Sequence, residues 1–436
     1  MNIWKYYLNI SNRDMLITCR VNDRIHFAKD EGVRLKKTDT YYIHEPGRVF
    51  KAIVRGIVRA GFRVVLNLRS EKSDDIDKLY GATILIGNHL SAIDPFVMGA
   101  YVTKRWVHYL TSQSYFEYPA LKKILTYLGA IPKRQGMSDI RAMKVALNVL
   151  KDNKVIGLFP EGARTIDGSM LPFNNSAAKL IKKTGSNVVV SYLCGASISL
   201  PRWYRGCSGG FRRGGIEHKA YVLLTKEQVS TMSVEQIDLR IREALYYNEY
   251  DWQREKKVEF KSRSMAEGMH AILHKCPKCL TDYSMKSKGM FLYCDECDNT
   301  AVVDKYGLLN AQTEDDVSFG DMPEWRAWQN THLEKEVASD DFVMEFPGSL
   351  TVKDSYGKVL KEYTDSYLKI TKVEVIYTYP EGKTVLPFHS ITDAVCDYSL
   401  RFEINQEQFS YQFTPLSGQA VIKITDAIKC IKGILR

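Results

Sequence analysis

Residues 82–95, ATILIGNHLSAIDP, combine an uninterrupted apolar run with a polar pair and a signal for the start of a helix. The run ends on Asn88 and His89, and Asp94 and Pro95 follow shortly afterwards. Asp is favoured as an N-cap and Pro at the first helical position, so one interpretation makes Asp94 a cap and His89 a polar loop residue. The alternative is a functional site at the end of a buried strand. The rest of the chain decides between them.

Similar apolar runs alternate with helical patterns between residues 80 and 225. Short runs rich in β-branched residues predict further buried strands at 107–112, 155–160 and 187–193. Helical periodicity with Gly or Asn stops predicts helices at 120–129, 139–153 and 175–185. Such alternation is typical of an α/β domain with a largely parallel sheet, whose sites lie where strands end and helices begin.

The stretch FPEGART at 159–165 follows another of these strands. It supplies a carboxylate from Glu161, a guanidinium from Arg164, and a glycine, Gly162, beside which backbone N–H groups can approach a ligand. Backbone N–H groups and Arg together bind anions, and Arg holds phosphate in a bidentate fork. Taken alone, the stretch is also compatible with a turn that carries a surface ion pair.

Three motifs together resemble those of the 1-acyl-glycerol-3-phosphate O-acyltransferases, also called lysophosphatidic acid acyltransferases. NHLSAID at 88–94, GAIPKR at 129–134 and FPEGAR at 159–164 occur in the order and approximate spacing of that family. The family hallmark is His, four residues and Asp, followed later by a Phe-Pro-Glu-Gly-x-Arg block. The resemblance implies that the α/β domain, placed at 76–262, is an acyltransferase domain.

The resemblance implies transfer of an acyl group from acyl-CoA or acyl-carrier protein to the free hydroxyl of lysophosphatidic acid, giving phosphatidic acid. His89 is the implied general base, because an alcohol is a poor nucleophile at neutral pH and histidine has an unperturbed pKa of about 6.5. Asp94 would orient the imidazole, with no covalent acyl-enzyme. Glu161, Gly162 and Arg164 would bind the acceptor phosphate region. The alternative acceptor is another lysophospholipid or polar-lipid alcohol.

Two positions depart from the family pattern. The second motif commonly places its arginine six residues after the glycine, whereas here Arg134 comes five after Gly129. Arg134 is therefore assigned to the acceptor phosphate as a helper. The fourth motif usually has a proline in its strand, whereas this chain has Val190, a change that concerns substrate fit.

CPKC at 276–279 and CDEC at 294–297 place two Cys-x-x-Cys pairs in one short segment. This spacing is typical of structural zinc held by four thiolates, and the predicted ligands are Cys276, Cys279, Cys294 and Cys297. The alternative is a pair of redox dithiols. We predict a zinc ribbon over residues 263–305.

The length of 436 residues predicts several domains, and the composition, 45% hydrophobic and 26% charged, is that of a globular protein. The formal charge is +10, and residues 1–70 concentrate 14 Lys and Arg against 6 Asp and Glu. Such a region prefers nucleic acid or membrane headgroups. It contains no recognisable nucleic-acid motif, so a nucleic-acid-binding or partner-binding protein is the less favoured interpretation.

The segment 49–69, within the basic region 1–75, has the pattern of an amphipathic helix of the membrane interface. Its basic residues recur four apart at Lys51, Arg55, Arg59 and Arg63. Such a helix can bury its apolar face among acyl chains, and the alternative is a core-packed helix with a solvated basic edge. Since no signal peptide or long apolar span is visible, we expect a cytoplasmic protein bound peripherally to the inner face of the membrane.

The last third of the chain changes character. Residues 306–342 are predicted to form an acidic linker, and alternating apolar and polar residues predict half-buried strands from 343 onward. A helix closes the chain. Antiparallel strands followed by one C-terminal helix at 343–436 resemble a pleckstrin-homology-like β-sandwich, whose ligand the sequence leaves open.

Overall fold

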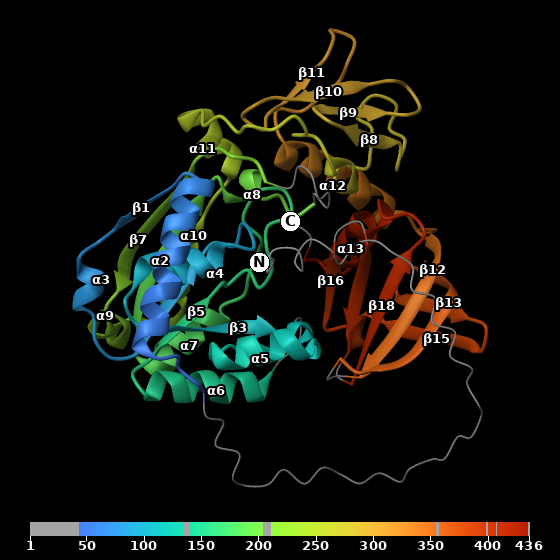
Figure 1. The fold of residues 1–436 in the computed structure, drawn as a ribbon. Helices are drawn as coiled ribbons and strands as arrows, with labels where there is room; N and C mark the ends of the chain where they lie inside the picture. Colours follow the sequence, from blue (N-terminus) through green and yellow to red (C-terminus); the bar gives the residue numbers. More distant parts are fainter. Residues whose placement is uncertain are drawn as a thin grey trace, which may run out of the picture.

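The computed structural model describes residues 43–134, 139–203, 211–354, 357–397, 400–406 and 408–434. Residues 1–42, most of the predicted basic region, lie outside these ranges. Figure 1 shows three parts, which are an α/β domain, a small ribbon and a β-rich C-terminal domain. Among the described residues, no helix is long and apolar enough to span a membrane.

A seven-stranded sheet in the order β1-β7-β6-β2-β5-β3-β4 forms the centre of the α/β domain. β7 is antiparallel to β6, while the other neighbouring pairs are parallel, which confirms a largely parallel sheet. β1 pairs with β7 along its whole length, so the sheet begins inside the range assigned to the N-terminal region. The strands are β1 (Leu68–Lys72), β2 (Thr83–Gly87), β3 (Val107–Ser112), β4 (Ile131–Lys133), β5 (Val155–Leu158), β6 (Asn187–Cys194) and β7 (Ile216–Leu224).

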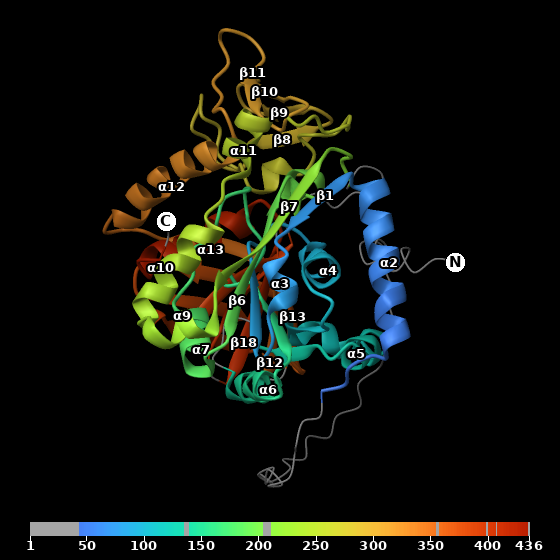
Figure 2. The same ribbon diagram turned by 90° about the vertical axis from the view of Figure 1, so that its left-hand side faces the viewer.

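Helices cover both faces of this sheet (Figure 2). β2 is buried throughout, and its side chains alternate, with Ile84 and Ile86 in one apolar core and Leu85 in the other. One face carries α6 (Ile140–Lys151), α7 (Ser176–Thr184), α9 (Lys226–Thr231) and α10 (Val234–Leu245). The other carries α2 (Arg48–Val65), α3 (Asp75–Lys78), α4 (Asp94–Val97) and the π-helical η1 (Met98–Val102). The remaining short helices of this domain are η2 (Gln113–Glu117), α5 (Pro119–Tyr127), α8 (Ala196–Ser199) and α11 (Glu249–Lys256).

Two of the four basic residues of helix α2, Arg55 and Arg59, bond to the rest of the domain, while Arg63 is exposed. This differs from the alternative of a core-packed helix whose basic edge is solvated throughout. The Arg55 guanidinium donates to the carbonyl of Arg105 at 2.8 Å, and that of Arg59 donates to the carbonyl of Ala100 at 2.7 Å. Ala100 lies in η1, and because the last carbonyls of a helix lack partners within it, Arg59 supplies one from outside. The apolar side of α2 is left exposed.

The ribbon, which we call the cysteine ribbon (residues 263–311), is a four-stranded antiparallel sheet in the order β11-β10-β9-β8. It shares one apolar core with the α/β domain, because Met265 and Met269 cluster with Trp203 as well as with Cys276. The ribbon is therefore packed against its neighbour. Its elements are η3 (Met269–Ala271), β8 (Met285–Lys288), β9 (Phe291–Cys294), β10 (Thr300–Val303) and β11 (Leu309–Ala311).

The range predicted as a linker, 306–342, instead contains β11 and the 17-residue helix α12 (Met322–Ala338). Trp325 is fully buried, and its indole N–H donates to the carbonyl of Lys275 at 3.1 Å. This segment is structured because its large side chains pack between the cysteine ribbon and the C-terminal domain.

The C-terminal domain is β-rich and ends in a helix, as predicted. Its antiparallel sheet has the order β15-β14-β13-β12-β18-β17-β16, and β12 pairs with both β13 and β18. A pleckstrin-homology-like identity stays a prediction. The elements are β12 (Met344–Asp354), β13 (Val359–Ile370), β14 (Glu374–Tyr379), β15 (Gly382–Pro387), η4 (Phe388–Ser390), β16 (Asp393–Asp397), β17 (Arg401–Asn405), β18 (Phe409–Pro415) and α13 (Ala420–Ile431).

Candidate active site

The site begins where β2 ends. Asn88 is fully buried, and its amide donates to the carbonyl of Leu193 at 2.8 Å while accepting from the N–H of the same residue at 2.9 Å. Both polar ends of Asn88 are thus used to fasten β2 to β6. A Cβ on Gly87 would lie 2.9 Å from the carbonyl oxygen of Ser191, so only glycine fits at this crossing. The side chain of the next residue, His89, takes no part in this connection between β2 and β6.

His89 and Asp94 form a hydrogen-bonded pair. Nδ1 of His89 lies 2.8 Å from Oδ2 of Asp94, whose side chain is fully buried. The Asp94 carboxylate also accepts from the N–H of Ser91 at 2.9 Å and from its hydroxyl at 2.8 Å. Because a carboxylate only accepts, Nδ1 carries the proton, and in the neutral imidazole Nε2 is then the nitrogen with the lone pair. Asp94 is the first residue of α4 and not its N-cap, so the capping interpretation fails.

The imidazole of His89 is also held by stacking. Its ring lies 4.2 Å from that of Phe159, with 20° between the planes, and the side chain is 19% exposed. Phe159 opens the FPEGAR motif, so this contact joins the two motifs. The packed ring leaves one edge of the histidine accessible in a defined orientation.

The backbone of His89 is bonded twice to the same stretch. Its N–H donates to Oε1 of Glu161 at 2.8 Å, and its carbonyl accepts from the N–H of Thr165 at 2.8 Å. His89 and Glu161 are 72 residues apart in the sequence. The fold therefore brings the two motifs into hydrogen-bonded contact at the ends of the adjacent strands β2 and β5.

The Glu161 carboxylate accepts hydrogen bonds from three protein donors. Oε2 accepts from the N–H of Leu171 at 2.8 Å and from the hydroxyl of Tyr247 at 3.0 Å, and the residue is 9% exposed. Burial raises the pKa of Glu161 to about 8, against the three donated hydrogen bonds, which lower it. These bonds hold Glu161 against the backbone of His89, and its contact with the acceptor stays a prediction. Leu171 and Tyr247 belong to no motif, so the sequence carried no signal for them.

The remaining predicted acceptor residues lie on two loops. Gly162 is exposed with φ of +71°, and its N–H donates to the carbonyl of Phe159 at 3.0 Å, which closes a tight turn before the half-buried Arg164. Arg134 follows β4 at the edge of the sheet, beyond β5 and β3 from β2. Its Nε lies 3.8 Å from the carboxylate of Asp139, which partners its charge.

Comparison with known proteins places a family on this part of the chain. Residues 67–193 match the acyltransferase family model. The chain carries an acyltransferase domain. The matched range includes His89, Asp94, Arg134 and the whole FPEGAR motif, and it covers less than half of the chain.

Several relatives are similar to this domain. A 1-acyl-sn-glycerol-3-phosphate acyltransferase of Borreliella burgdorferi is 28% identical over 132 residues, covering 30% of this chain and 50% of that protein. The protein of the same name from Bacillus subtilis is 22% identical over 172 residues, covering 37% of this chain and 79% of that protein. The crystal structure of the 1-acyl-sn-glycerophosphate (LPA) acyltransferase of Thermotoga maritima superposes with a TM-score of 0.40 at 20% identity, covering 48% of this chain and 81% of that chain.

The chain spans about half of the Borreliella protein and 36% of a chloroplastic 1-acyl-sn-glycerol-3-phosphate acyltransferase of Brassica napus. These similarities therefore concern the acyltransferase domain. The cysteine ribbon and the C-terminal domain lie beyond the residues that match the family model.

The four predicted metal ligands converge in the cysteine ribbon. Their Sγ atoms all lie within 4.8 Å of one another, with Cys276 and Cys297 at 3.6 Å and Cys279 and Cys294 at 3.7 Å. A tetrahedral site with Zn–S bonds of about 2.3 Å has S···S edges of about 3.8 Å, so the thiols fit zinc. Both Cys-x-x-Cys turns end in a residue with positive φ, Leu280 at 64° and Asp298 at 58°.

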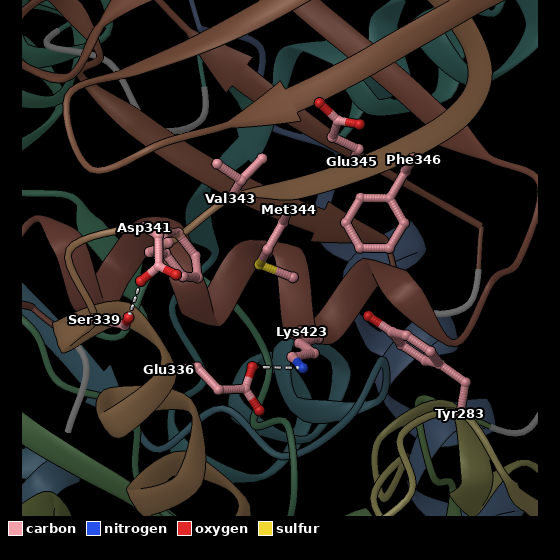
Figure 3. Close-up of a pocket in the computed structure, with 10 residues that line it drawn as sticks. Tyr283, Glu336, Ser339, Asp341, Val343, Met344, Glu345, Phe346 and Lys423 are labelled. Carbon is pink, nitrogen blue, oxygen red and sulfur yellow. Dashed lines mark hydrogen bonds and ion pairs between the residues drawn. The ribbon is translucent and has the colours of Figure 1, made fainter.

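A cavity of about 480 Å³ lies outside the acyltransferase domain, where the cysteine ribbon meets α12, β12 and α13 (Figure 3). Tyr283, Met344 and Phe346 line it together with the amine of Lys423, which lies 2.7 Å from the Glu336 carboxylate. None of its lining residues belongs to the site around His89.

Proposed function

We propose that this chain transfers an acyl group from a thioester donor to the free hydroxyl of 1-acyl-glycerol-3-phosphate, giving phosphatidic acid. The observation that carries the proposal is the His89–Asp94 pair, 2.8 Å apart, within the region that matches the acyltransferase model. The names of the similar proteins from Borreliella and Bacillus support this acceptor.

His89 acts as the general base. Its Nε2 takes the proton of the acceptor hydroxyl while that oxygen attacks the carbonyl carbon of the donor thioester. Asp94 keeps the proton on Nδ1 and stabilises the imidazolium that forms. The new C–O bond replaces the C–S bond, and the imidazolium returns its proton to the departing thiolate. The same chemistry serves acyl-CoA and acyl-carrier protein as donors.

Arg164 binds the acceptor phosphate, with the exposed turn at Gly162 beside it and Arg134 as a helper. The His89 backbone makes two hydrogen bonds to the FPEGART stretch, one to the Glu161 side chain and one to the N–H of Thr165, and these bonds set the distance between the base and this phosphate site. A phosphate held there keeps the neighbouring hydroxyl near Nε2, and such positioning accounts for much of the rate of a two-substrate reaction. Glu161 fixes the position of the His89 backbone by accepting from its N–H.

Product analysis tests the proposal directly. The purified full chain is incubated with lysophosphatidic acid, anionic vesicles and either acyl-CoA or acyl-carrier protein, and lipids are identified by mass spectrometry. We expect phosphatidic acid with at least one donor, and much less product from unphosphorylated monoacylglycerol. No acylated lipid with either donor would contradict the proposal.

The apolar side of α2 docks the enzyme on the inner face of the membrane. Val49, Ile53, Ile57 and Val64 are 74%, 55%, 67% and 68% exposed, while Arg55 and Arg59 bond the helix to η1 and its neighbours. An exposed apolar helix side of this kind can be buried among acyl chains.

Vesicle co-sedimentation tests this docking. Replacing both Ile53 and Ile57 by Ser should weaken binding to anionic vesicles at least about tenfold, because burying each side chain contributes about 1.5–3 kcal/mol. Leu239→Ser is the matched control, since Leu239 is 56% exposed on α10, across the sheet from α2. Unchanged binding of the double variant would remove α2 from the membrane contact.

The four cysteines hold zinc as a structural centre. Bound zinc supplies folding free energy to the ribbon, and a site closed by four thiolates leaves no open position for a substrate. We therefore place Cys276, Cys279, Cys294 and Cys297 outside the chemical step.

A further inference from the structure

One buried guanidinium joins the C-terminal domain to the loop of the candidate active site. Arg326 of α12 donates from Nη1 to Asp167 at 3.1 Å and from Nη2 to both oxygens of Asp426 at 2.9 and 2.8 Å. The three side chains are only 9%, 5% and 3% exposed. Asp167 lies in the loop 161–171 of the acyltransferase domain, and Asp426 lies in α13. The bonded residues are thus far apart in the sequence.

A short series of hydrogen bonds connects Asp167 to His89. Its carboxylate also accepts from the N–H of Ser169 at 3.0 Å, and the carbonyl of Ser169 accepts from the hydroxyl of Thr165 at 2.6 Å. The N–H of Thr165 then donates to the carbonyl of His89. A shift of Asp167 would therefore move the loop that carries Arg164 and fixes the histidine.

A second guanidinium makes a parallel link. Arg202 donates from Nη1 to the carbonyl of Arg164 at 3.2 Å and from Nη2 to the carbonyl of Cys396 at 3.1 Å. Cys396 belongs to β16, the edge strand of the C-terminal sheet. The backbone of the predicted phosphate-binding residue is thereby bonded to the C-terminal domain.

The far end of the Arg326 link is itself immobilised. Lys423, three residues before Asp426 on α13, is paired with Glu336 at 2.7 Å (Figure 3) and with Asp282 of the cysteine ribbon at 2.8 Å. Residues three apart lie on the same side of a helix. One side of α13 thus contacts α12, the ribbon and, through Arg326, the active-site loop.

We propose that Arg326 is a positioning residue for acyl transfer, through which α13 holds the 161–171 loop in its productive place. Arg202 makes the same connection from β16. The C-terminal domain is then part of the catalytic unit, and an isolated acyltransferase domain would bind the acceptor poorly. This inference rests on the proposed function.

Asp426→Asn is the informative variant, because it removes the charge and one of the two acceptor oxygens on the side remote from the site and leaves Arg326 beside Asp167. We expect kcat/KM for lysophosphatidic acid to fall by about 10²-fold, the loss that a misplacement of about 1 Å causes. The KM for the acyl donor should change little. Arg254→Met is the matched control, since Arg254 joins α11 to Asp321 of the α12 N-cap without contacting the loop.

Hydrogen exchange supplies a readout that needs no activity. In the folded Asp426→Asn protein, amides of residues 161–171 should exchange faster than in the wild type, and in Arg254→Met they should not. Arg202→Met provides a second break that spares the buried carboxylates, and Arg202→Lys should recover part of the kinetic loss. If Asp426→Asn and Arg202→Met lower only the melting temperature, with unchanged kinetic constants and loop exchange, the inference is overturned.

The proposed function fails separately. Absence of phosphatidic acid from the wild type would refute the acyl transfer, yet faster loop exchange in Asp426→Asn would still support the link from α13. Active wild type together with unaffected variants would refute the positioning role alone.

Discussion

In the cysteine ribbon all four thiols of the motif converge on one point. In the active-site motifs, by contrast, some side chains are buried within the structure and one is partly exposed. Four Sγ atoms converge within 4.8 Å, and each is a candidate ligand. At the end of β2, by contrast, Asn88 and Asp94 are fully buried and only His89 is partly exposed. Its neighbours hold it in place. In the proposed function, the ribbon motif is therefore a folding device, and the active-site motifs combine a reactive group with the groups that position it.

The difference has an energetic consequence. Removing one ligand of a metal site removes folding free energy, while removing a partly exposed reactive side chain changes the core little. Variants of the two regions should therefore separate stability from turnover. The expected effects are largest for the ribbon.

Cys279→Ser should abolish stoichiometric zinc binding and unfold the ribbon. Structural zinc contributes about 10–16 kcal/mol in small zinc-binding peptides, and the ribbon core includes Trp203 of the acyltransferase domain, so the neighbouring domain should also lose stability. Metal analysis and thermal unfolding measure both effects. Cys430→Ser, in α13 outside the cluster, is the control. Absence of zinc from protein purified without chelator would contradict the proposed zinc site.

His89→Ala should lower turnover by a factor of about 10² to 10⁴ and leave the melting temperature nearly unchanged. The reason is that Nε2 is the proposed proton acceptor, while the partly exposed ring contributes little to the core. Steady-state kinetics and calorimetry on the same preparation test this, with His389→Ala on the C-terminal domain as the matched control. Near-full turnover in folded His89→Ala protein would exclude the proposed mechanism.

Glu161→Gln should change how stability depends on pH. Burial raises the pKa of Glu161 to about 8 from its ordinary value of 4.5. The contribution of the neutral acid to the free energy of unfolding is full below pH 4.5. It declines by about 1.4 kcal/mol per pH unit until pH 8, because only the unfolded state ionises in that range. The glutamine does not titrate. The deficit of the variant relative to the wild type should thus shrink as the pH rises.

Denaturant unfolding at several pH values measures this deficit. Glu243→Gln on the exposed side of α10 is the control. A deficit of Glu161→Gln that is constant with pH would show that the pKa of Glu161 is the same in the folded and unfolded states.

Arg164→Lys should raise the acceptor KM roughly tenfold with a smaller effect on kcat, since lysine keeps the charge but loses the two-pronged hydrogen bond. The effect should shrink with an unphosphorylated acceptor, and Arg134→Lys should have a smaller effect of the same kind. Equal losses with both acceptors would make Arg164 a structural residue and reopen the choice of acceptor.

Local patterns account for the parts of the protein that were predicted from the sequence. The parallel-rich sheet follows from short apolar runs between periodic helices, and the thiol cluster follows from two Cys-x-x-Cys turns. The His89–Asp94 pair forms across five residues, a separation that one loop spans. In each case, the residues that matter are neighbours in the sequence, so their spacing carries the information.

Tertiary structure decided the roles that depend on distant partners. In the sequence Glu161 resembles a ligand-binding carboxylate, whereas in the structure the N–H of Leu171 and the hydroxyl of Tyr247 donate to it. Amphipathic spacing described α2 correctly as two-sided, but which side faces the protein was decided by carbonyls of other segments that accept from its arginines. The charge of Arg326 within a predicted linker gave no hint of burial, since only folding brings Asp167 and Asp426 to it. A side chain's chemistry is local, but its burial and its partners depend on the whole chain.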